Sequence, residues 1–222
     1  MQKFKTVSLA DQVFEKLEED IITGVYPRGE LLTELKLVEQ LGVSRTPIRE
    51  AMLRLAQERL IQDSGKGAIV LGITQEDLLD IMNIRQRIEG LAAYYATLNL
   101  TAEGKEELKK VTMLQDFYFA NRDVDSLRKT DDQFHDLIYD LSQRTVIRDM
   151  LYQLHHKTLR YRRASIDDPK RLEKSVQEHK AICDAICAGD ADLASELMIK
   201  HITNAKENMM GRFVVFQRSQ AA

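Results

Sequence analysis

The sequence predicts a mainly α-helical protein, with an N-terminal winged helix-turn-helix followed by an all-helical bundle of six to seven helices. Residues 1–72 contain two short helical patterns separated by a glycine bend and followed by a glycine-rich hairpin pattern. Residues 73–222 contain long amphipathic runs, a single proline and no convincing strand alternation. We therefore expect two domains, residues 1–72 and 73–222.

The first domain begins with a predicted helix of about four turns. Apolar residues recur near a period of 3.6 from Leu9 to Ile22, Ser8 stands at the expected N-cap, and Gly24 lies just past the expected end. Residues 26–29, Tyr-Pro-Arg-Gly, have the composition of a turn.

Two shorter helices and a hairpin are predicted next. The first helix runs from Glu34 to Leu41 and ends at a glycine, and a bend of a few residues leads into the second, from Thr46 to Arg59. This is the layout of a helix-turn-helix. Strands are expected at Leu60–Asp63 and Ala68–Leu71, around a tip of sequence Ser-Gly-Lys-Gly, which completes the outline of a winged helix.

Six helical segments are predicted in the second domain. Thr74 and Thr101 are the expected N-caps of the first two, and a bundle is the simplest packing for such a set. The segments are Gln75–Leu98, Ala102–Asn121, Val124–Ser142, Val146–Ala164, Lys170–Ala188 and Ala191–Met210.

Composition and charge exclude several classes of protein. The 222 residues include 32 Lys+Arg and 35 Asp+Glu, and the net charge of -3 excludes a polycation that coats nucleic acid. No stretch approaches the roughly 18 apolar residues of a membrane helix, and the N-terminus lacks a signal-peptide core, so we expect a cytoplasmic protein without a membrane partner. Two cysteines within one helical pattern, Cys183 and Cys187, exclude a disulfide scaffold.

The start of the third predicted helix carries the residue types that read DNA. Short polar or basic side chains at the head of a helix reach base edges, while apolar residues opposite hold the helix to its domain. Between residues 44 and 67 there are five basic and three acidic residues. A solvated amphipathic helix is the alternative, which the neighbouring helix and hairpin disfavour. The polar set is Ser44, Arg45, Thr46, Arg49 and Glu50, and the apolar set is Ile48, Ala51, Met52 and Leu55.

About sixty residues of the first domain resemble the winged-helix domain of GntR-type bacterial transcription regulators. The resemblance lies in YPRGELL, in LVEQLGVSRTPIREAMLRLAQERLI and in GKGAIV. Arg59 departs from the pattern because it stands where the family usually has glycine, and Leu35 replaces a residue that is basic in many members. We assign contacts with double-stranded operator DNA to Ser44, Arg45, Thr46, Arg49, Lys66 and Gly67.

The second domain resembles the FCD effector-binding domain of the FadR-like branch. The similar stretches are QEDLLDIMNIRQRIEGLAAYYA, DDQFHDLIYDLS and SVQEHKAICDAICAGDADLASELMIKH. In that family the domain commonly holds a divalent metal through one aspartate and three histidines. The resemblance places these ligands at Asp131, His135, His179 and His201.

The residues themselves are compatible with such a site. Asp131 and His135 are four residues apart, which puts both on one helix face with Cβ atoms about 6 Å apart. Imidazole and carboxylate together suit zinc first, and also nickel, manganese or iron. Asp132 is a weaker alternative to Asp131. Each histidine alone is more often a surface or hydrogen-bonded core residue, and we expect His155 and His156 at the surface and Glu178 pointing away from the site.

A metal with four protein ligands keeps open positions that a small carboxylate or hydroxy acid can fill. A nearby cation would hold the far end of that effector, and the candidates are Arg85 and Arg162 or its neighbour Arg163. Alternatively, Arg85 pairs with Glu89, four residues on. Cys183 and Cys187 continue a stripe from His179 and are expected to fill the core, with a thiol sensor or a soft-metal site as the alternative.

Together these features predict a transcription regulator, not an enzyme. Two winged helices of a homodimer would read an inverted repeat, and effector binding would change operator affinity. The alternatives are a metal-dependent hydrolase, for which no H-E-x-x-H motif is present, and a non-enzymatic metal-binding adaptor.

Overall fold

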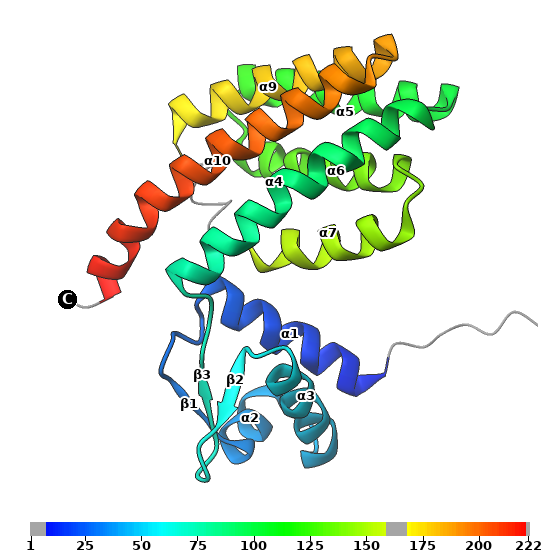
Figure 1. The fold of residues 1–222 in the computed structure, drawn as a ribbon. Coiled ribbons are helices and arrows are strands. Elements are labelled where there is room, and N and C mark those ends of the chain that lie inside the picture. Colours follow the sequence, from blue (N-terminus) through cyan, green and yellow to red (C-terminus); the bar gives the residue numbers. More distant parts are fainter. Residues whose placement is uncertain (1–7, 159–167, 221–222) are drawn as a thin grey trace, which may run out of the picture. The chain divides into compact units, whose positions relative to one another are not determined.

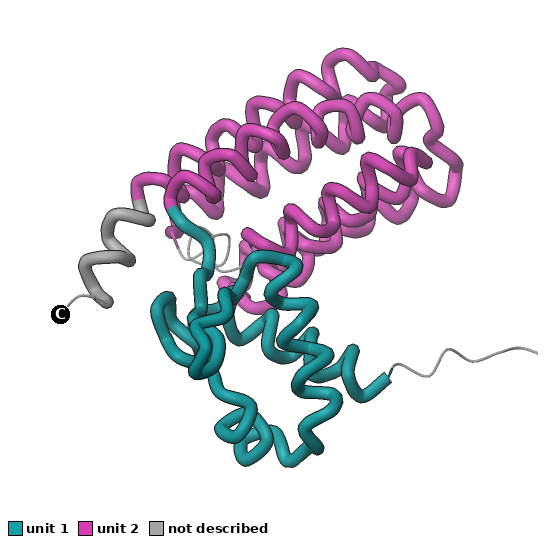
Figure 2. The backbone as a smooth tube through the Cα atoms, turned by 60° about the horizontal axis from the view of Figure 1, so that its bottom comes forward, with its two compact units in different colours: residues 1–74 teal, residues 75–222 magenta. Residues whose placement is uncertain are grey.

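The computed structural model describes residues 8–158 and 168–220 of the chain. The chain divides into two compact units, residues 1–74 and residues 75–222 (Figure 2). Among the described residues, no helix is both long enough and apolar enough to span a bilayer.

Unit 1 combines three helices with a small antiparallel sheet (Figure 1). The strand order is β1-β3-β2, with Leu31 opposite Ile69 and Ile61 opposite Val70. The two-residue strand β1 was not predicted, because its pairing with a distant hairpin strand leaves no local pattern. The elements are α1 (Leu9–Thr23), β1 (Leu31–Leu32), α2 (Glu34–Leu41), α3 (Arg45–Gln57), β2 (Ile61–Asp63) and β3 (Ala68–Val70).

Local capping fixes the helix ends of unit 1 where the sequence predicts them. The Ser8 hydroxyl accepts a hydrogen bond from the Asp11 backbone, and the Asp11 carboxylate accepts one from the Ser8 backbone, which forms a capping box. Gly24 and Gly42 end α1 and α2 in the left-handed conformation, at φ 83° and 66°. The start of α3 lies one residue earlier than expected, at Arg45.

The core of unit 1 draws on every helix and on the sheet. Leu17, Leu32, Leu37, Ile48 and Leu55 are each fully buried, and each contributes about 1.5–3 kcal/mol of hydrophobic stabilisation. The face of α3 that was expected to be apolar is therefore the one that packs inward.

Arg59 occupies a backbone position that favours glycine. Its φ angle is 57°, in the left-handed region, and it lies in the turn between α3 and β2. This geometry explains why the family pattern has glycine at this point.

Unit 2 is an all-helical bundle in which α4 packs along α10 and also contacts α6, α7 and α9. The predicted helices agree with the structure to within a residue or so, except at two ends. The predicted end of the fourth segment, Ala164, lies outside the described residues, and the last helix continues past Met210. The elements are α4 (Gln75–Leu98), α5 (Ala102–Ala120), α6 (Val124–Leu141), α7 (Thr145–Lys157), α9 (Pro169–Ala188) and α10 (Ala191–Gln220).

The centre of unit 2 is polar as well as apolar. Phe134, Ile138 and Met82 are fully buried there, as expected for a bundle core. Among them lie ionisable side chains that a purely structural core does not need, and they come from four helices. These are Arg85, Glu89, His135, His179 and His201, each at most 3% exposed.

Candidate metal centre and DNA-binding surface

The head of α3 presents the expected polar side chains to solvent. Ser44, Arg45, Thr46 and Arg49 are exposed, whereas Ile48 is buried. Ser44 is at the N-cap position, and its hydroxyl makes no capping hydrogen bond within the described part of the chain. These side chains are therefore placed to reach a ligand outside the domain.

Arg49 is already paired in the free protein. Its Nε donates to both carboxylate oxygens of Glu34 on α2, at 2.8 and 2.9 Å. This hydrogen bonding lowers the pKa of the Glu34 carboxyl below its usual range. The pair therefore ties α3 to the first turn of α2.

Arg54, one of the five basic residues between residues 44 and 67, contacts α1, and its side chain remains 42% exposed. Its Nη1 donates to Asp11 Oδ1 at 2.6 Å, and its guanidinium lies 3.9 Å from the centre of the Phe14 ring. Arg54 therefore ties α3 to α1.

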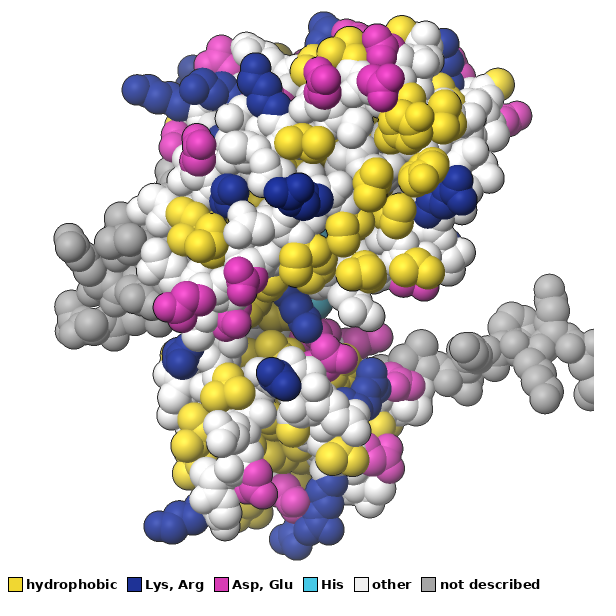
Figure 3. Space-filling view, viewed as in Figure 1, with side chains coloured by type: hydrophobic (Ala, Val, Ile, Leu, Met, Phe, Trp, Pro, Cys, Tyr) yellow, Lys and Arg dark blue, Asp and Glu magenta, His cyan; other side chains and the backbone are white. Residues whose placement is uncertain are grey.

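The wing has one exposed cation and one glycine with a structural role. Lys66 is exposed at the hairpin tip, and basic side chains project along the lower edge of unit 1 in Figure 3. Gly67 has a φ of 149°, and a Cβ there would lie 2.5 Å from the Leu32 carbonyl oxygen. The close approach of β1 to β3 therefore requires glycine at this position.

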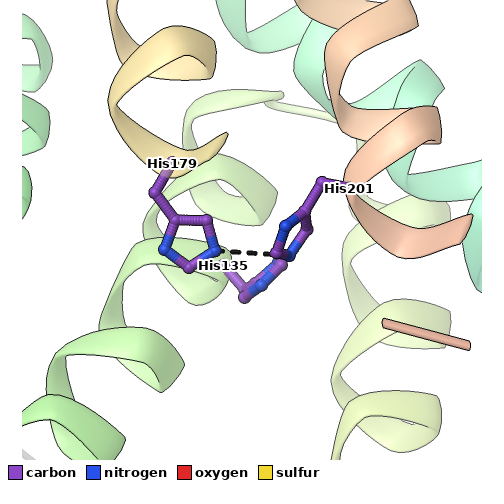
Figure 4. A group of neighbouring side chains, drawn as sticks. All are labelled: His135, His179 and His201. Atoms are coloured by element: carbon purple, nitrogen blue, oxygen red, sulfur yellow. Dashed lines mark hydrogen bonds between the residues drawn. The ribbon is translucent and has the colours of Figure 1, made fainter. Parts of the chain in front are cut away.

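Three predicted ligands converge in the middle of unit 2. His135 comes from α6, His179 from α9 and His201 from α10, and one ring nitrogen of each lies within 4.8 Å of the others. His179 Nε2 and His201 Nε2 are 3.3 Å apart (Figure 4). The three imidazoles thus face one another at one point.

Each imidazole is oriented by a hydrogen bond at its Nδ1 atom. A carboxylate or amide oxygen lies within hydrogen-bond distance of every Nδ1, which favours the tautomer with Nδ1 protonated and Nε2 free. The pairs are His135 with Glu89 Oε2 at 2.8 Å, His179 with Gln115 Oε1 at 3.1 Å, and His201 with Glu178 Oε2 at 2.7 Å.

This arrangement fits a metal ion. With all three Nδ1 atoms protonated, the Nε2 lone pairs point at one another, and two acceptors 3.3 Å apart repel unless a proton or a cation lies between them. Burial chiefly lowers the pKa of His201, which favours the neutral imidazole that metals bind. The carboxylates at Nδ1 of His135 and His201 are the usual support for a metal-binding histidine, and the Gln115 amide oxygen takes that place at His179.

Of the two candidate aspartates, Asp131 lies beside the cluster. Its Oδ1 is 3.8 Å from His179 Nε2. Asp132 instead lies 3.2 Å from His155 Nε2. The geometry therefore favours Asp131 as the oxygen ligand.

Arg85 pairs with Glu89, as the alternative interpretation expected. Its Nε donates to Glu89 Oε1 at 2.7 Å and its Nη1 to Thr158 Oγ1 at 3.0 Å. Burial alone would raise the pKa of Glu89, but the charges of Arg85 and His135 outweigh it and hold that pKa far below its usual range. Glu89 is therefore ionised, and it pairs with Arg85 and with His135 at the same time.

A cavity adjoins the histidines, and Arg171 brings a second guanidinium to it. Arg171 is 7% exposed, its Nη1 donates to Glu178 Oε2 at 2.8 Å, and it was not predicted as a site residue. Its sequence signal was weak, because no local spacing relates Arg171 to His135 and His201, which lie on other helices. Arg162 and Arg163 lie outside the described residues. The lining residues include Arg85, Asp131, His135, Arg171, Ser175 and His201.

Two expectations about side-chain placement are wrong. His155 is 5% exposed, not at the surface, because its Nδ1 meets the Tyr139 hydroxyl at 3.1 Å and its Nε2 meets Asp132. Glu178 does not turn away from the site, because it supports His201 and Arg171 together. These contacts lower the pKa of Glu178 to about 2 against the opposing effect of burial.

Comparison with known proteins identifies both units. The model of bacterial regulatory proteins of the gntR family matches residues 9–70, and the FCD domain model matches residues 80–204. The HTH-type transcriptional repressor RspR of Escherichia coli (strain K12) is 26% identical over 205 residues, which cover 92% of this chain and 90% of that protein. The Uxu operon regulator of Haemophilus influenzae is 28% identical over 227 residues, covering 88% and 79%.

Solved structures support the same fold. The structure of McbR/YncC from E. coli has a TM-score of 0.71 at 23% identity, and the match covers 98% of this chain and 100% of that one. The FCD match alone spans more than half of the chain. The gntR match precedes it along the chain, which is the order that the sequence predicted. The chain is therefore a member of the GntR family of bacterial transcription regulators, DNA-binding proteins rather than enzymes, and carries an FCD effector-binding domain.

Proposed function

We propose that this regulator reads an inverted-repeat operator as a homodimer, and that an organic acid bound beside a divalent metal ion in unit 2 sets its operator affinity. The observation that carries the proposal is the convergence of three supported imidazoles on one point beside a cavity with two guanidinium groups. Because its partner is bacterial DNA, the protein would act in the cytoplasm.

The proposed metal ligands are His135, His179, His201 and Asp131. Three imidazoles and a carboxylate suit zinc first, with nickel, manganese or iron as the alternatives. When bound, the ion would offer open coordination positions to an oxygen of the effector. The role of Glu89, Gln115 and Glu178 is to orient the imidazoles.

The two guanidinium groups of the cavity, together with the proposed metal ion, favour an acidic effector. Arg171 is the better placed cation, because it is buried, lines the cavity and also lies against the His201 ring, with Nη2 3.4 Å from Nδ1. Arg85 lines the same cavity, and each guanidinium already pairs with a carboxylate, Arg85 with Glu89 and Arg171 with Glu178. A carboxylate or hydroxy acid would complement these guanidinium groups.

An apolar stripe on α4 supports the homodimer. Ile84, Leu91 and Leu98 are spaced by seven residues, and each is at least 42% exposed. Figure 3 shows exposed hydrophobic side chains across this face of unit 2. Exposed apolar patches of this kind commonly form protein interfaces. Sedimentation of the wild type and of Leu91→Asp tests the assignment, which predicts a dimer that the charge disrupts.

In unit 1 we propose base and phosphate contacts by the head of α3 and the wing. Ser44, Arg45, Thr46 and Arg49 would enter the major groove, and Lys66 would contact the backbone or the minor groove beside Gly67. Arg45→Ala and Arg49→Ala should each weaken specific binding by about 1–3 kcal/mol.

The DNA test needs an operator fragment, a nonspecific duplex and a charge control. Lys180→Ala removes one exposed positive charge from unit 2 and should leave operator affinity unchanged. Binding should also fall steeply as salt rises, because phosphate contacts release counterions. Equal operator affinity in both α3 arginine variants and the wild type would exclude this recognition surface.

Metal analysis of purified protein tests the proposed centre. His179→Ala and His201→Ala should each lose most of the bound metal. His156→Ala is the matched control, because it removes a half-buried histidine of the same unit that lies outside the cluster. Equal metal content in all four proteins would refute the metal assignment.

A further inference from the structure

Two thiols lie side by side on α9, in the two turns that follow His179. They are the only cysteines of the chain, and their Sγ atoms are 3.9 Å apart. Cys183 is 3% exposed, while Cys187 is partly exposed and so gives access from solvent. The expectation that both fill the core therefore holds for Cys183 and not for Cys187.

The spacing of the sulfurs suits one atom held between them. Two thiolates on a tetrahedral metal with bonds of about 2.3 Å lie about 3.8 Å apart, and the narrower bond angles of a pyramidal trivalent centre would draw these two sulfurs slightly closer. A disulfide instead needs Cβ atoms about 3.5–4.5 Å apart, whereas positions four apart on a helix have Cβ atoms about 5–6 Å apart. The helix geometry thus favours bridging by a third atom over direct S–S bonding.

The surroundings of the thiols narrow the class of ligand. Burial raises the pKa of Cys183 to about 12, and the Thr112 hydroxyl donates to its Sγ at 3.7 Å. Within the described ranges, the groups of three or more ligating side chains include the histidine cluster and none at these thiols. A ligand satisfied by two sulfurs is therefore favoured over an ion that needs four protein donors.

We propose that Cys183 and Cys187 form a dithiol site for a trivalent arsenical or a similar thiophile that takes two sulfur bonds. With a hydrated arsenical, R–As(OH)₂, two As–O bonds break and two As–S bonds form. Each thiol proton leaves with a hydroxide as water, and arsenic remains trivalent. Cys187 reacts first because it is accessible, and Cys183 closes the ring.

The test uses phenylarsine oxide and the intact mass of the folded full-length chain. The wild type should gain one phenylarsenic group with both hydroxyls lost, retain it against excess glutathione, and release it to dithiothreitol. Cys187→Ser, at the partly exposed position, should lose the arsenical to glutathione, as should Cys183→Ser. The double variant is free of thiols and gives the background.

His201→Ala separates this proposal from the metal centre, because it should keep the arsenical whether or not metal is lost. Circular dichroism of each variant checks that the proteins compared are folded. If Cys183→Ser does not fold, the comparison of the wild type with Cys187→Ser is enough to test the proposal. Release from the wild type to glutathione as readily as from Cys187→Ser would overturn the proposal. So would an internal disulfide formed by the folded chain under mild peroxide.

Discussion

Glu89 carries two buried interactions at once, and replacing it with glutamine should destabilise unit 2. The side chain is fully buried, with Oε1 2.7 Å from Arg85 Nε and Oε2 2.8 Å from His135 Nδ1. Glu89→Gln keeps the shape but removes the charge, which leaves the Arg85 guanidinium in the core without a counter-charge. Breaking a buried ion pair in this way costs about 3–5 kcal/mol.

Calorimetry and urea unfolding of the full chain would measure this loss. For a unit of about 150 residues, each kcal/mol lowers Tm by about 2–4 °C, so the expected decrease is on the order of 10 °C. Metal affinity should also fall by about 10–100-fold, because the variant weakens the support of the His135 imidazole.

A double variant provides the control. Arg85→Met/Glu89→Gln removes both charges but keeps an acceptor for His135 Nδ1, so it should be more stable than Glu89→Gln alone. A Glu89→Gln protein within 1 kcal/mol of the wild type, or a double variant no better than the single one, would refute this account of the buried pair.

Four further outcomes follow, three in unit 1 and one in unit 2. Arg59→Gly should raise the free energy of unfolding by about 0.5–1 kcal/mol in urea titrations, because φ is positive there, and Arg122→Gly, also at φ 57°, should do the same in unit 2. Gly67→Ala should lose about 1–3 kcal/mol and weaken amide protection in β1 and β3, since the methyl group meets the Leu32 carbonyl oxygen. Asp11→Asn should be less stable than the wild type at neutral pH, with a gap that closes in acid. The Ser8 and Arg54 hydrogen bonds lower the pKa of Asp11. The contribution of Asp11 to the free energy of unfolding is therefore present above the usual aspartate range and is lost as the pH falls through the folded-state pKa. Unfolding curves of both proteins at several pH values would measure this.

Local signals explain what the sequence predicted well. The ends of α1 and α2 depend on Ser8, Gly24 and Gly42, whose capping preferences act within a few residues. The apolar face of α3 follows from helical period alone. Strand β1 escaped prediction because two residues carry no period, and the pairing depends on a hairpin far along the chain.

The site was predictable only in part, because it too depends on contacts between residues far apart in the chain. The histidines were placed by resemblance to a family, and the sequence alone gives no distance between α6, α9 and α10. Gln115 and Glu178 support His179 and His201 through contacts between helices, which single-residue patterns do not encode. The burial of His155 likewise results from packing against Tyr139. Arg85 with Glu89 was the exception, since four residues on one helix is a local spacing.

The polar centre of unit 2 also has a practical use, because five helices contribute to it. His135, His179 and His201 come from α6, α9 and α10, while Glu89 and Gln115 bring in α4 and α5. Any small molecule that favours the folded centre must raise the melting point of the whole bundle, by roughly 5–10 °C at a hundredfold excess over its Kd. Libraries of metabolites can therefore be screened by heating the purified protein with a dye, before a single promoter is known.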